Sequence, residues 1–216
     1  MKYHRKTQLK TYCIVFFLDN CKKIRNIKIL YIIAGCNGAG KTTASLTMLP
    51  EIWKCREFVN ADEIAKGLSP YNPEGVAIEA GRLMLQRIDM LLQGDDSFSI
   101  ETTLSTRSYS NMIKKAHDNG FTVQLLFFWL PAPDIAVERV KQRVSEGGHN
   151  IPVDVIHRRY KAGINNFFNI YCNIVDSWLL VENYSVPRII IAKGGKDTET
   201  ELIDVELFNK MKAYVR

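Results

Sequence analysis

Residues 35–42 have the composition and order needed to hold a polyphosphate. They read Gly-Cys-Asn-Gly-Ala-Gly-Lys-Thr, which fits the pattern G-x-x-x-x-G-K-[ST], and they follow the apolar run of residues 27–34. In this pattern, backbone N–H groups of a glycine-rich turn surround the phosphates, the lysine reaches the β- and γ-phosphates, and the hydroxyl is placed to ligate Mg²⁺. The residues expected to bind ATP or GTP are Gly35, Cys36, Asn37, Gly38, Ala39, Gly40, Lys41, Thr42 and Thr43, with Thr42 on the metal.

A second polar segment follows the next expected strand. Asp62 comes shortly after residues 56–60, Arg-Glu-Phe-Val-Asn. In an open α/β sheet the carboxyl ends of the strands border the ligand crevice, so Asp62 is a candidate general base that faces the γ-phosphate. An acid in the first turn of a helix, favoured by the helix dipole, is an equally good interpretation of the spacing.

A third polar segment, Glu101-Thr-Thr-Leu-Ser-Thr-Arg107, ends the expected strand at residues 97–100. A carboxylate such as Glu101 suits hydrogen bonds from a hydroxylated substrate, or support of Mg²⁺ through water. Thr103 and Arg107 suit polar groups or phosphate of the same substrate. The alternative is that Ser105 or Thr106 only caps the next helix.

Arginines form two groups on either side of a glycine pair. Arg143 lies in the last turn of an expected helix over residues 133–145, and Arg158 follows the segment Gly147-Gly-His149. Two basic helices joined by a glycine hinge favour a mobile lid that brings Arg143 and Arg158 onto a transferring phosphate. A solvated helix face is the alternative. His149 has no histidine nearby, so we expect a structural role or a substrate contact rather than metal binding.

The distribution of charge argues against a nucleic-acid partner. The 216-residue chain has a formal charge of +6, but residues 1–28 contain eight of its 29 basic residues and one of its 23 acidic residues. The remainder is therefore close to −1. Residues 1–27 are expected to be an extension of uncertain role. Their apolar run, Tyr12 to Leu18, is too short to span a bilayer, so no membrane partner is expected.

The cysteines indicate a reducing compartment. The chain has five, at positions 13, 21, 36, 55 and 172, an odd number without metal-ligand spacing. We therefore expect a cytoplasmic protein without a zinc site. Cys36 lies in the phosphate loop at a helix N-terminus, where the pKa of a thiol can be lowered. Alternatively, Cys36 only fills a tolerant position of the loop.

Alternating strand and helix signals predict the elements that must position these residues. Strands are expected over residues 27–34, 56–60, 97–100, 121–130, 178–182 and 188–192. Helices are expected over residues 42–48, 74–92, 106–119, 133–145 and 200–214. This order predicts an α/β fold, the three-layer sandwich of P-loop NTPases, with a mostly parallel sheet and helices on both faces. We expect this fold to form one domain over residues 28–216.

Taken together, these segments resemble the zeta-toxin superfamily of P-loop kinases, and in particular its shorter branch, described as predicted ABC-type ATPases. The resembling residues are Asn37-Gly-Ala-Gly-Lys-Thr42, Asn60-Ala-Asp-Glu63, Ala80-Gly-Arg82, Glu101-Thr-Thr-Leu-Ser105, Arg139-Val, Arg143-Val, Gly147-Gly-His149 and Arg158-Arg-Tyr160. The resemblance implies that the acid at Asp62 acts as base on a substrate hydroxyl, that Glu101 and Thr103 bind substrate, and that lid arginines neutralise the transition state. It also implies a UDP-amino sugar as acceptor and an antitoxin protein as partner.

The sequence therefore predicts a Mg²⁺-dependent kinase that transfers the γ-phosphoryl group of ATP or GTP to a hydroxyl of a small molecule. One alternative is an ATP hydrolase of the ABC kind, although the chain has no Leu-Ser-Gly-Gly-Gln segment. Another is a nucleotide-binding toxin or regulatory module that acts with a protein partner.

Overall fold

The structure is a computed structural model of the chain and describes residues 27–51, 53–148 and 150–215. The strands are β1 (Ile29–Gly35), β2 (Glu57–Val59), β3 (Phe98–Thr102), β4 (Thr122–Trp129), β5 (Ser177–Glu182), β6 (Ile189–Gly195) and β7 (Thr198–Leu202). The helices are α2 (Lys41–Glu51), α3 (Ala61–Leu68), α4 (Ala77–Leu92), α5 (Tyr109–Asp118), α6 (Pro133–Ser145), α7 (Val153–Asn169) and α8 (Val205–Lys212), with 3₁₀ turns η1 (Pro73–Val76) and η2 (Tyr171–Asn173). His149 and all of the expected extension except Ile27 lie outside the described residues.

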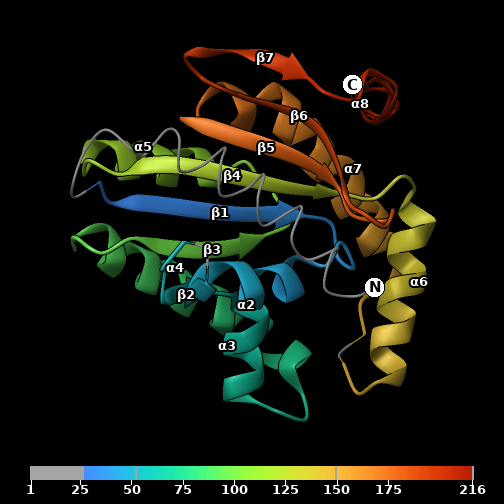
Figure 1. Cartoon of the computed structure of the whole chain (residues 1–216). Coiled ribbons are helices and arrows are strands. Elements are labelled where there is room, and N and C mark those ends of the chain that lie inside the picture. Colours follow the sequence, from blue (N-terminus) through green and yellow to red (C-terminus); the bar gives the residue numbers. More distant parts are fainter. Residues whose placement is uncertain (1–26, 52, 149, 216) are drawn as a thin grey trace.

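The described strands form one sheet in the order β2-β3-β1-β4-β5-β6-β7. Strands β1 to β5 are parallel, whereas β6 and β7 continue the sheet antiparallel to their neighbours. Helices cover both faces, with α2 on the near side of the sheet and α5 and α7 behind it in Figure 1. This arrangement confirms the predicted α/β fold with a mostly parallel sheet.

The position of β1 inside the sheet, between β3 and β4, brings the polar segments together. Its seven residues are all buried, which explains its continuous apolar sequence. Ala34 pairs with Thr102 of β3, and Gly35 pairs with Phe128 of β4. The carboxyl ends of three neighbouring strands therefore lie level with one another, and α6 stands beside that edge of the sheet in Figure 1.

Helix α7 belongs to the core, which corrects the expectation that the second basic helix is part of a mobile lid. Six of its residues are buried: Ile156, Tyr160, Gly163, Ile164, Asn166 and Phe167. The ring of Phe167 lies 5.0 Å from that of Phe127 in β4 and 5.4 Å from that of Trp178 in β5. Burial of a side chain of this size stabilises a fold by about 1.5–3 kcal/mol, so α7 is held against the sheet.

The C-terminal region differs from its prediction, because the expected helix over residues 200–214 begins later. Residues Thr198–Leu202 form the edge strand β7, and all five are exposed. An edge strand that buries neither face has no apolar alternation, so its sequence gives no strand signal. Helix α8 starts after Asp204, whose side chain accepts a hydrogen bond of 3.0 Å from the N–H of Leu207.

Two sequence expectations concern membranes and disulfides. None of the helices in residues 27–51, 53–148 and 150–215 is long and apolar enough to cross a membrane. Within the same residues, Cys36, Cys55 and Cys172 are free thiols. Cys13 and Cys21 lie outside the described part of the chain.

Asp176 joins three segments at the amino-terminal ends of the strands, on the side of the sheet opposite the polar segments. Its carboxylate accepts hydrogen bonds from the N–H of Val123 at 2.7 Å and from His117 Nε2 at 2.8 Å. It also forms an ion pair with Lys196 Nζ at 2.8 Å. Burial alone would raise the pKa of Asp176, but the hydrogen bonds from Lys196, Val123 and His117 outweigh it and lower the pKa below its ordinary value.

We expect Asp176→Asn to lower the free energy of unfolding at pH 7 by about 1–3 kcal/mol, because it leaves donors without their charged acceptor. A carboxylate with a lowered folded-state pKa stabilises the fold above its unfolded pKa, and this contribution is lost as the pH falls through the folded value. The difference between the two proteins should therefore shrink in acid. Urea unfolding at pH 7 and below pH 4 measures it, with exposed Asp197→Asn as control. A difference that does not change with pH would contradict this role.

Candidate phosphate-binding and catalytic site

At three positions, the loop between β1 and α2 has a positive φ angle, a backbone conformation that favours glycine. Gly35, Gly38 and Gly40 have φ angles of +137°, +76° and +81°. A Cβ on Gly35 would lie 2.2 Å from the carbonyl oxygen of Phe128, and one on Gly40 would lie 2.6 Å from Nδ2 of Asn183. The glycines therefore provide both the turn and the close approach of strand ends that shape a phosphate cradle.

Lys41, Thr42 and Glu101 form a buried polar cluster at the start of α2. Lys41 Nζ donates to the carbonyl oxygen of Cys36 at 3.0 Å and lies 3.8 Å from Glu101 Oε1. The hydroxyl of Thr42 lies 3.0 Å and 2.9 Å from the two carboxylate oxygens of Glu101, to which it donates. The Lys41 and Glu101 side chains are only 7% and 8% exposed, so water screens their attraction little.

The environment of Glu101 makes its ionised form costly. Burial raises the pKa of Glu101, and the charge of Lys41 and the hydrogen bond from Thr42 offset only part of this effect. The negative charges of Asp62 and Glu63 raise the pKa further. A group with positive charge that entered between Glu101 and Asp62 would relieve this repulsion.

Asn183 and Arg139 support the loop from the side opposite Glu101. Asn183 follows β5 and donates through Nδ2 to the carbonyl oxygen of Ala39 at 2.5 Å. Arg139 of α6 donates to the carbonyl oxygens of Gly38 at 3.3 Å and Asn183 at 3.0 Å. Because the carbonyl oxygens of Gly38 and Ala39 accept these hydrogen bonds, the peptide groups of the loop have fixed orientations.

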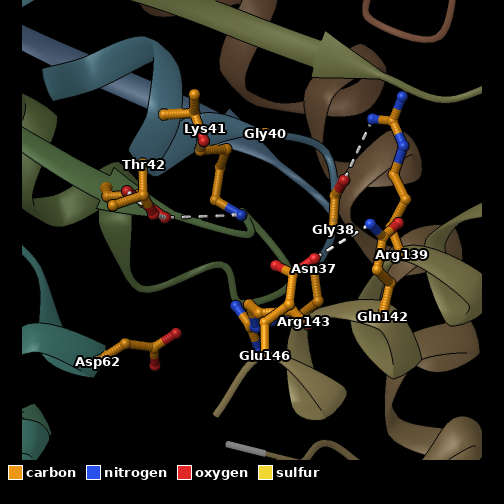
Figure 2. Close-up of a pocket in the computed structure, with 12 residues that line it drawn as sticks. Asn37, Gly38, Gly40, Lys41, Thr42, Asp62, Arg139, Gln142, Arg143 and Glu146 are labelled. Atoms are coloured by element: carbon orange, nitrogen blue, oxygen red, sulfur yellow. Dashed lines mark hydrogen bonds and ion pairs between the residues drawn. The ribbon is translucent and has the colours of Figure 1, made fainter. Parts of the chain in front are cut away.

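The first cavity, of about 380 Å³, lies in front of the loop (Figure 2). Its lining residues are Asn37, Gly38, Gly40, Lys41, Thr42, Thr43, Asp62, Glu101, Arg139, Gln142, Arg143 and Glu146. Figure 2 shows Lys41 and Thr42 on one side, the side chains of α6 on another, and Asp62 across the opening. The structure thus brings together Lys41, Asp62 and Arg143, three of the four residues expected to be catalytic.

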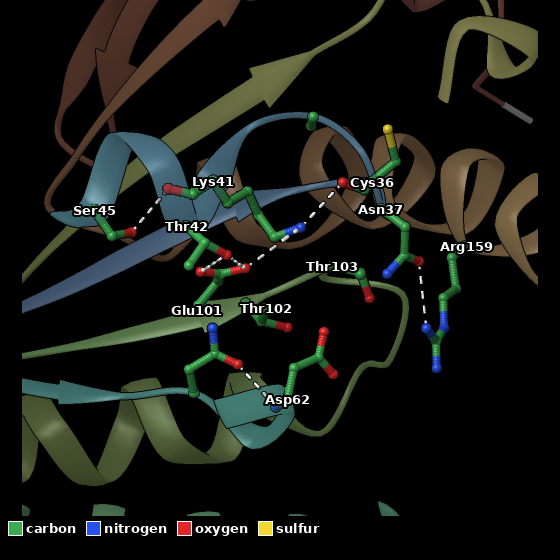
Figure 3. A network of polar contacts seen from close by, with 12 residues as sticks. Cys36, Asn37, Lys41, Thr42, Ser45, Asp62, Glu101, Thr102, Thr103 and Arg159 are labelled. Atoms are coloured by element: carbon green, nitrogen blue, oxygen red, sulfur yellow. Dashed lines mark hydrogen bonds and ion pairs between the residues drawn. The ribbon is translucent and has the colours of Figure 1, made fainter. Parts of the chain in front are cut away.

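A second cavity, of about 220 Å³, adjoins the first along Lys41, Glu101 and Asp62. Much of its remaining lining is polar and comes from the end of β3 and the residues after it: Thr102, Thr103, Ser105, Thr106 and Tyr109. Figure 3 shows the Asp62 carboxylate directed into the same space as Lys41 and Thr103. Asp62 lies in the first turn of α3, and its N–H donates to Oδ1 of Asn60, the N-cap, at 2.8 Å. Asp62 is thus both an acid in the first turn of a helix and a residue of the cavity, because the start of α3 directs its side chain into the site.

A third cavity, of about 300 Å³, continues from Asp62 between α3, η1 and the start of α7. Ala61, Ala65, Ala77 and Val155 are among its apolar lining residues, and Arg158 and Arg159 provide positive charge. Arg158 contributes to this cavity and not to the first, so it lies away from the phosphate loop. Its neighbour Arg159 lines the second and third cavities and donates to Oδ1 of Asn37 at 3.3 Å.

Other expected site residues lie outside the cavities. Gly35, Cys36 and Ala39 are buried within the loop and do not line the first cavity. Burial raises the pKa of Cys36 to about 11, although the charges of Lys41 and Arg139 lower it slightly, so this thiol is not activated as its position suggested. Arg107 is exposed in the turn before α5 and lines none of the three cavities.

Sequence reasoning missed the contacts of Arg159 and Asn183. The apolar positions of α7, such as Ile156, Tyr160 and Ile164, define its buried face, and Arg159 lies closer to that face than Arg158. Helix phase could therefore have favoured Arg159. Asn183 follows a parallel strand directly, and the rule that ligands bind at strand carboxyl ends could have indicated it.

The donor set near the loop suits a metal that needs few protein ligands. Within the described residues, no cluster of three or more histidine, cysteine, aspartate or glutamate side chains could hold a metal ion. Mg²⁺ usually binds one or two protein oxygens together with substrate phosphates and water. The hydroxyl of Thr42 and the carboxylate of Glu101 are oxygens of that kind.

Comparison of the sequence with known families gives one match that covers most of the chain. The zeta toxin family model matches residues 18–185. An uncharacterized protein of Haemophilus influenzae is 32% identical over 137 residues, which are 63% of this chain and 94% of that protein.

Solved structures share the fold at low sequence identity. A chain of the AvrRxo1-ORF1:AvrRxo1-ORF2 complex with sulphate ions superposes with a TM-score of 0.73 and 17% identity over 97% of this chain and 71% of that chain. The same complex with ATP gives a TM-score of 0.71, 18% identity and coverage of 97% and 71%. The PezAT toxin-antitoxin system of Streptococcus pneumoniae gives 0.64, 15% identity and coverage of 95% and 86%.

We expect Glu101→Gln to make the stability of the protein less sensitive to pH. A carboxyl group whose folded-state pKa is raised stabilises the fold below its unfolded pKa, and that contribution is lost as the pH rises through the folded value. The variant cannot ionise here, so its free energy of unfolding should rise relative to wild type from about pH 4.5 upward. Urea unfolding between pH 4 and 8 measures the difference.

Glu101→Asp is the matched control, because it keeps an ionisable carboxyl group at the same position. It should retain the pH dependence of the wild type. A constant difference between wild type and Glu101→Gln across this range would show that burial does not perturb Glu101.

Proposed function

The chain belongs to the zeta toxin family, and on this premise we propose that it is a kinase that transfers the γ-phosphoryl group of ATP or GTP to a hydroxyl of a small molecule. The observation that carries the proposal is the position of Asp62, which lines the phosphate-loop cavity and both adjoining cavities. An acid at that junction would contact a triphosphate in the first cavity on one side and an acceptor in the adjoining cavities on the other.

The phosphate loop supports a nucleoside triphosphate as donor. Three glycines at positive φ leave room for phosphate oxygens close to the backbone, and the cavity beside them contains the cations of Lys41, Arg139 and Arg143. ATP is present in one complex that shares this fold, and we propose the same donor here. The sequence pattern itself fits ATP and GTP equally.

Thr42 and Glu101 are the residues that would hold Mg²⁺, directly or through water. Their oxygens already lie within 3.0 Å of one another, and the raised pKa of Glu101 fits a carboxylate that lacks a sufficient positive partner in the protein alone. When bound, the ion would neutralise charge on the β- and γ-phosphate oxygens.

Asp62 is proposed as the general base. The acceptor oxygen attacks the γ-phosphorus, its proton passes to the Asp62 carboxylate, and the bond to the β–γ bridging oxygen breaks to release a nucleoside diphosphate. The N-cap Asn60 and the first turn of α3 fix the position of the Asp62 carboxylate at the opening of the site. Lys41, Arg139 and Arg143 would contribute the rest of the rate enhancement, because they position the phosphates and neutralise their charge.

The second and third cavities describe the proposed acceptor. Hydroxyl groups of Thr103 and Ser105 line one, and an apolar floor with two guanidinium groups, Arg158 and Arg159, lines the other. A nucleotide sugar has hydroxyls for the first and an anionic phosphate for the second, so a UDP-amino sugar is our proposed acceptor class. On this proposal Arg158 binds the acceptor and not the transferring phosphate.

An antitoxin protein is a second proposed partner, and a cytoplasmic location is proposed with it. A solved structure with this fold comes from a toxin-antitoxin system, and the family is named for a toxin. Growth arrest on expression in a bacterial host, relieved by the product of a neighbouring gene, would support this role. Normal growth with measurable phosphoryl transfer would instead favour a metabolic kinase.

The direct test is transfer from γ-labelled ATP with Mg²⁺ to a panel of UDP-sugars, other metabolites and oligonucleotides. We expect label on a UDP-sugar and its loss in Lys41→Ala, because Lys41 lies against the phosphate loop. Label on no acceptor, despite tight ATP binding, would contradict the kinase proposal.

Asp62→Asn should reduce transfer by about 10²–10⁴-fold, the usual contribution of a positioned base, and leave the Kd for the nucleotide within about twofold. Single-turnover transfer and calorimetric titration measure the two effects. Glu63→Gln is the matched control, because Glu63 is the next acid in α3, lines none of the three cavities and forms an exposed ion pair with Lys66. Equal loss of transfer in both variants would contradict the assignment of Asp62.

A further inference from the structure

The residues between β3 and α5 include a leucine in an unusual backbone conformation. We refer to residues 103–108 as the acceptor loop, because four of the residues that line the second cavity lie in it or directly after it. Leu104 has a φ of +52° and a fully buried side chain. Residues other than glycine rarely adopt positive φ, and such strain persists only where the surrounding structure enforces it.

Two side chains hold Leu104 in this conformation. Its N–H donates to Thr102 Oγ1 at 3.1 Å, and its carbonyl oxygen accepts from Nδ2 of Asn166 at 2.8 Å. Asn166 belongs to α7, 62 residues further along the chain, and is only 5% exposed. A buried amide in this position makes a well-defined hydrogen bond, because no water competes for it.

Helix α7 and the 3₁₀ turn η2 that follows it contact the acceptor loop on both sides of Leu104. A Cβ on Gly163 would lie 2.6 Å from the carbonyl oxygen of Thr103, so only glycine allows the helix to approach this closely. Just beyond the helix, the hydroxyl of Tyr171 donates to the carbonyl oxygen of Thr106 at 2.6 Å. Contacts at Thr103, Leu104 and Thr106 thus fix the path of the loop.

The other end of the same helix contacts the phosphate loop. Arg159 donates to Oδ1 of Asn37, and the helix between Arg159 and Asn166 is packed into the core. Helix α7 therefore connects the loop that would hold the donor with the loop that would hold the acceptor. A rigid helix keeps their separation constant, which in-line phosphoryl transfer requires.

We propose that Asn166 is a positioning residue for the acceptor: its hydrogen bond to Leu104 holds the acceptor loop so that the hydroxyls of Thr103 and Ser105 line the second cavity. This inference rests on the kinase function proposed above. The hydroxyls of these two residues lie 2.9 Å apart, so a shift at Leu104 would move them together. Asn166 itself lines none of the three cavities and acts through the backbone.

The experiment compares wild type with Asn166→Asp, which keeps the size of the side chain but replaces the donor by an oxygen facing the Leu104 carbonyl. Amide hydrogen exchange should rise at least tenfold over residues 103–108 and stay unchanged over residues 35–42. With the acceptor identified in the labelling panel, the KM for that acceptor should rise about tenfold, and the KM for ATP should stay within twofold.

Two further variants keep the test decisive. Gly163→Ala should produce the same changes by displacing the loop, and it provides a second result should Asn166→Asp unfold. Asn169→Asp is the matched control, because Asn169 is exposed on the same helix and its side chain donates to Oδ1 of Asn165 at 3.1 Å, away from the acceptor loop. Cooperative thermal unfolding shows that each variant is folded.

The outcomes separate this inference from the kinase proposal. Unchanged exchange over residues 103–108 in folded Asn166→Asp and Gly163→Ala would overturn the inference, whether or not the wild type transfers phosphate. Increased exchange with an unchanged acceptor KM would overturn it as well. Absence of transfer in the wild type, with increased exchange in the variants, would instead overturn the kinase function.

Discussion

Parallel pairing of β1 between β3 and β4 is the constraint on which the whole site depends. The pairing of Ala34 with Thr102 and of Gly35 with Phe128 sets the phosphate loop level with the end of β3, so that Glu101 meets Lys41 and Thr42. A slip of one residue would direct Glu101 to the other face of the sheet. The continuous burial of β1 makes the central position of this strand energetically favourable, because both of its faces are apolar.

The charges of the site depend on one another because they are shielded from water. Lys41 and Glu101 are buried at one end of the loop, so removal of Lys41 would leave the Glu101 carboxylate without its positive partner. Even with Lys41 present, the pKa of Glu101 is raised. The same burial raises the pKa of Cys36. The buried carboxylate of Glu101, next to a loop that favours anions, suits a ligand that contains both phosphate and a cation.

Helix α7 shows how tertiary packing changes the meaning of a sequence pattern. Basic residues on both sides of a glycine pair favoured a lid, yet the apolar residues of the second helix pack against β4 and β5. The arginines at its start therefore have fixed positions: Arg159 contacts the phosphate loop, and Arg158 faces the third cavity. Packing of the helix also explains why residues distant in the chain, such as Asn166, contact the loop after β3.

The sequence by itself determined the features that arise from local chemistry. The glycine spacing specifies the phosphate loop, because positive φ and close backbone approach are properties of glycine alone. Apolar runs and their spacing specified β1, β4, α4 and α6 to within a few residues, and with them the α/β fold. Asp62 and Glu101 were identified because polar residues that follow strands of a parallel sheet meet at one edge.

Only the tertiary structure decided the features that depend on contacts between distant segments. The choice of Arg159 over Arg158 beside the phosphate loop, the support of that loop by Asn183, and the position of Arg107 outside the cavities follow from how helices and turns pack. The raised pKa of Cys36 and the strained Leu104 have the same origin, since burial and enforced backbone conformation exist only in the folded chain. The edge strand β7 had no sequence signal, because it buries neither face and is defined by its pairing with β6.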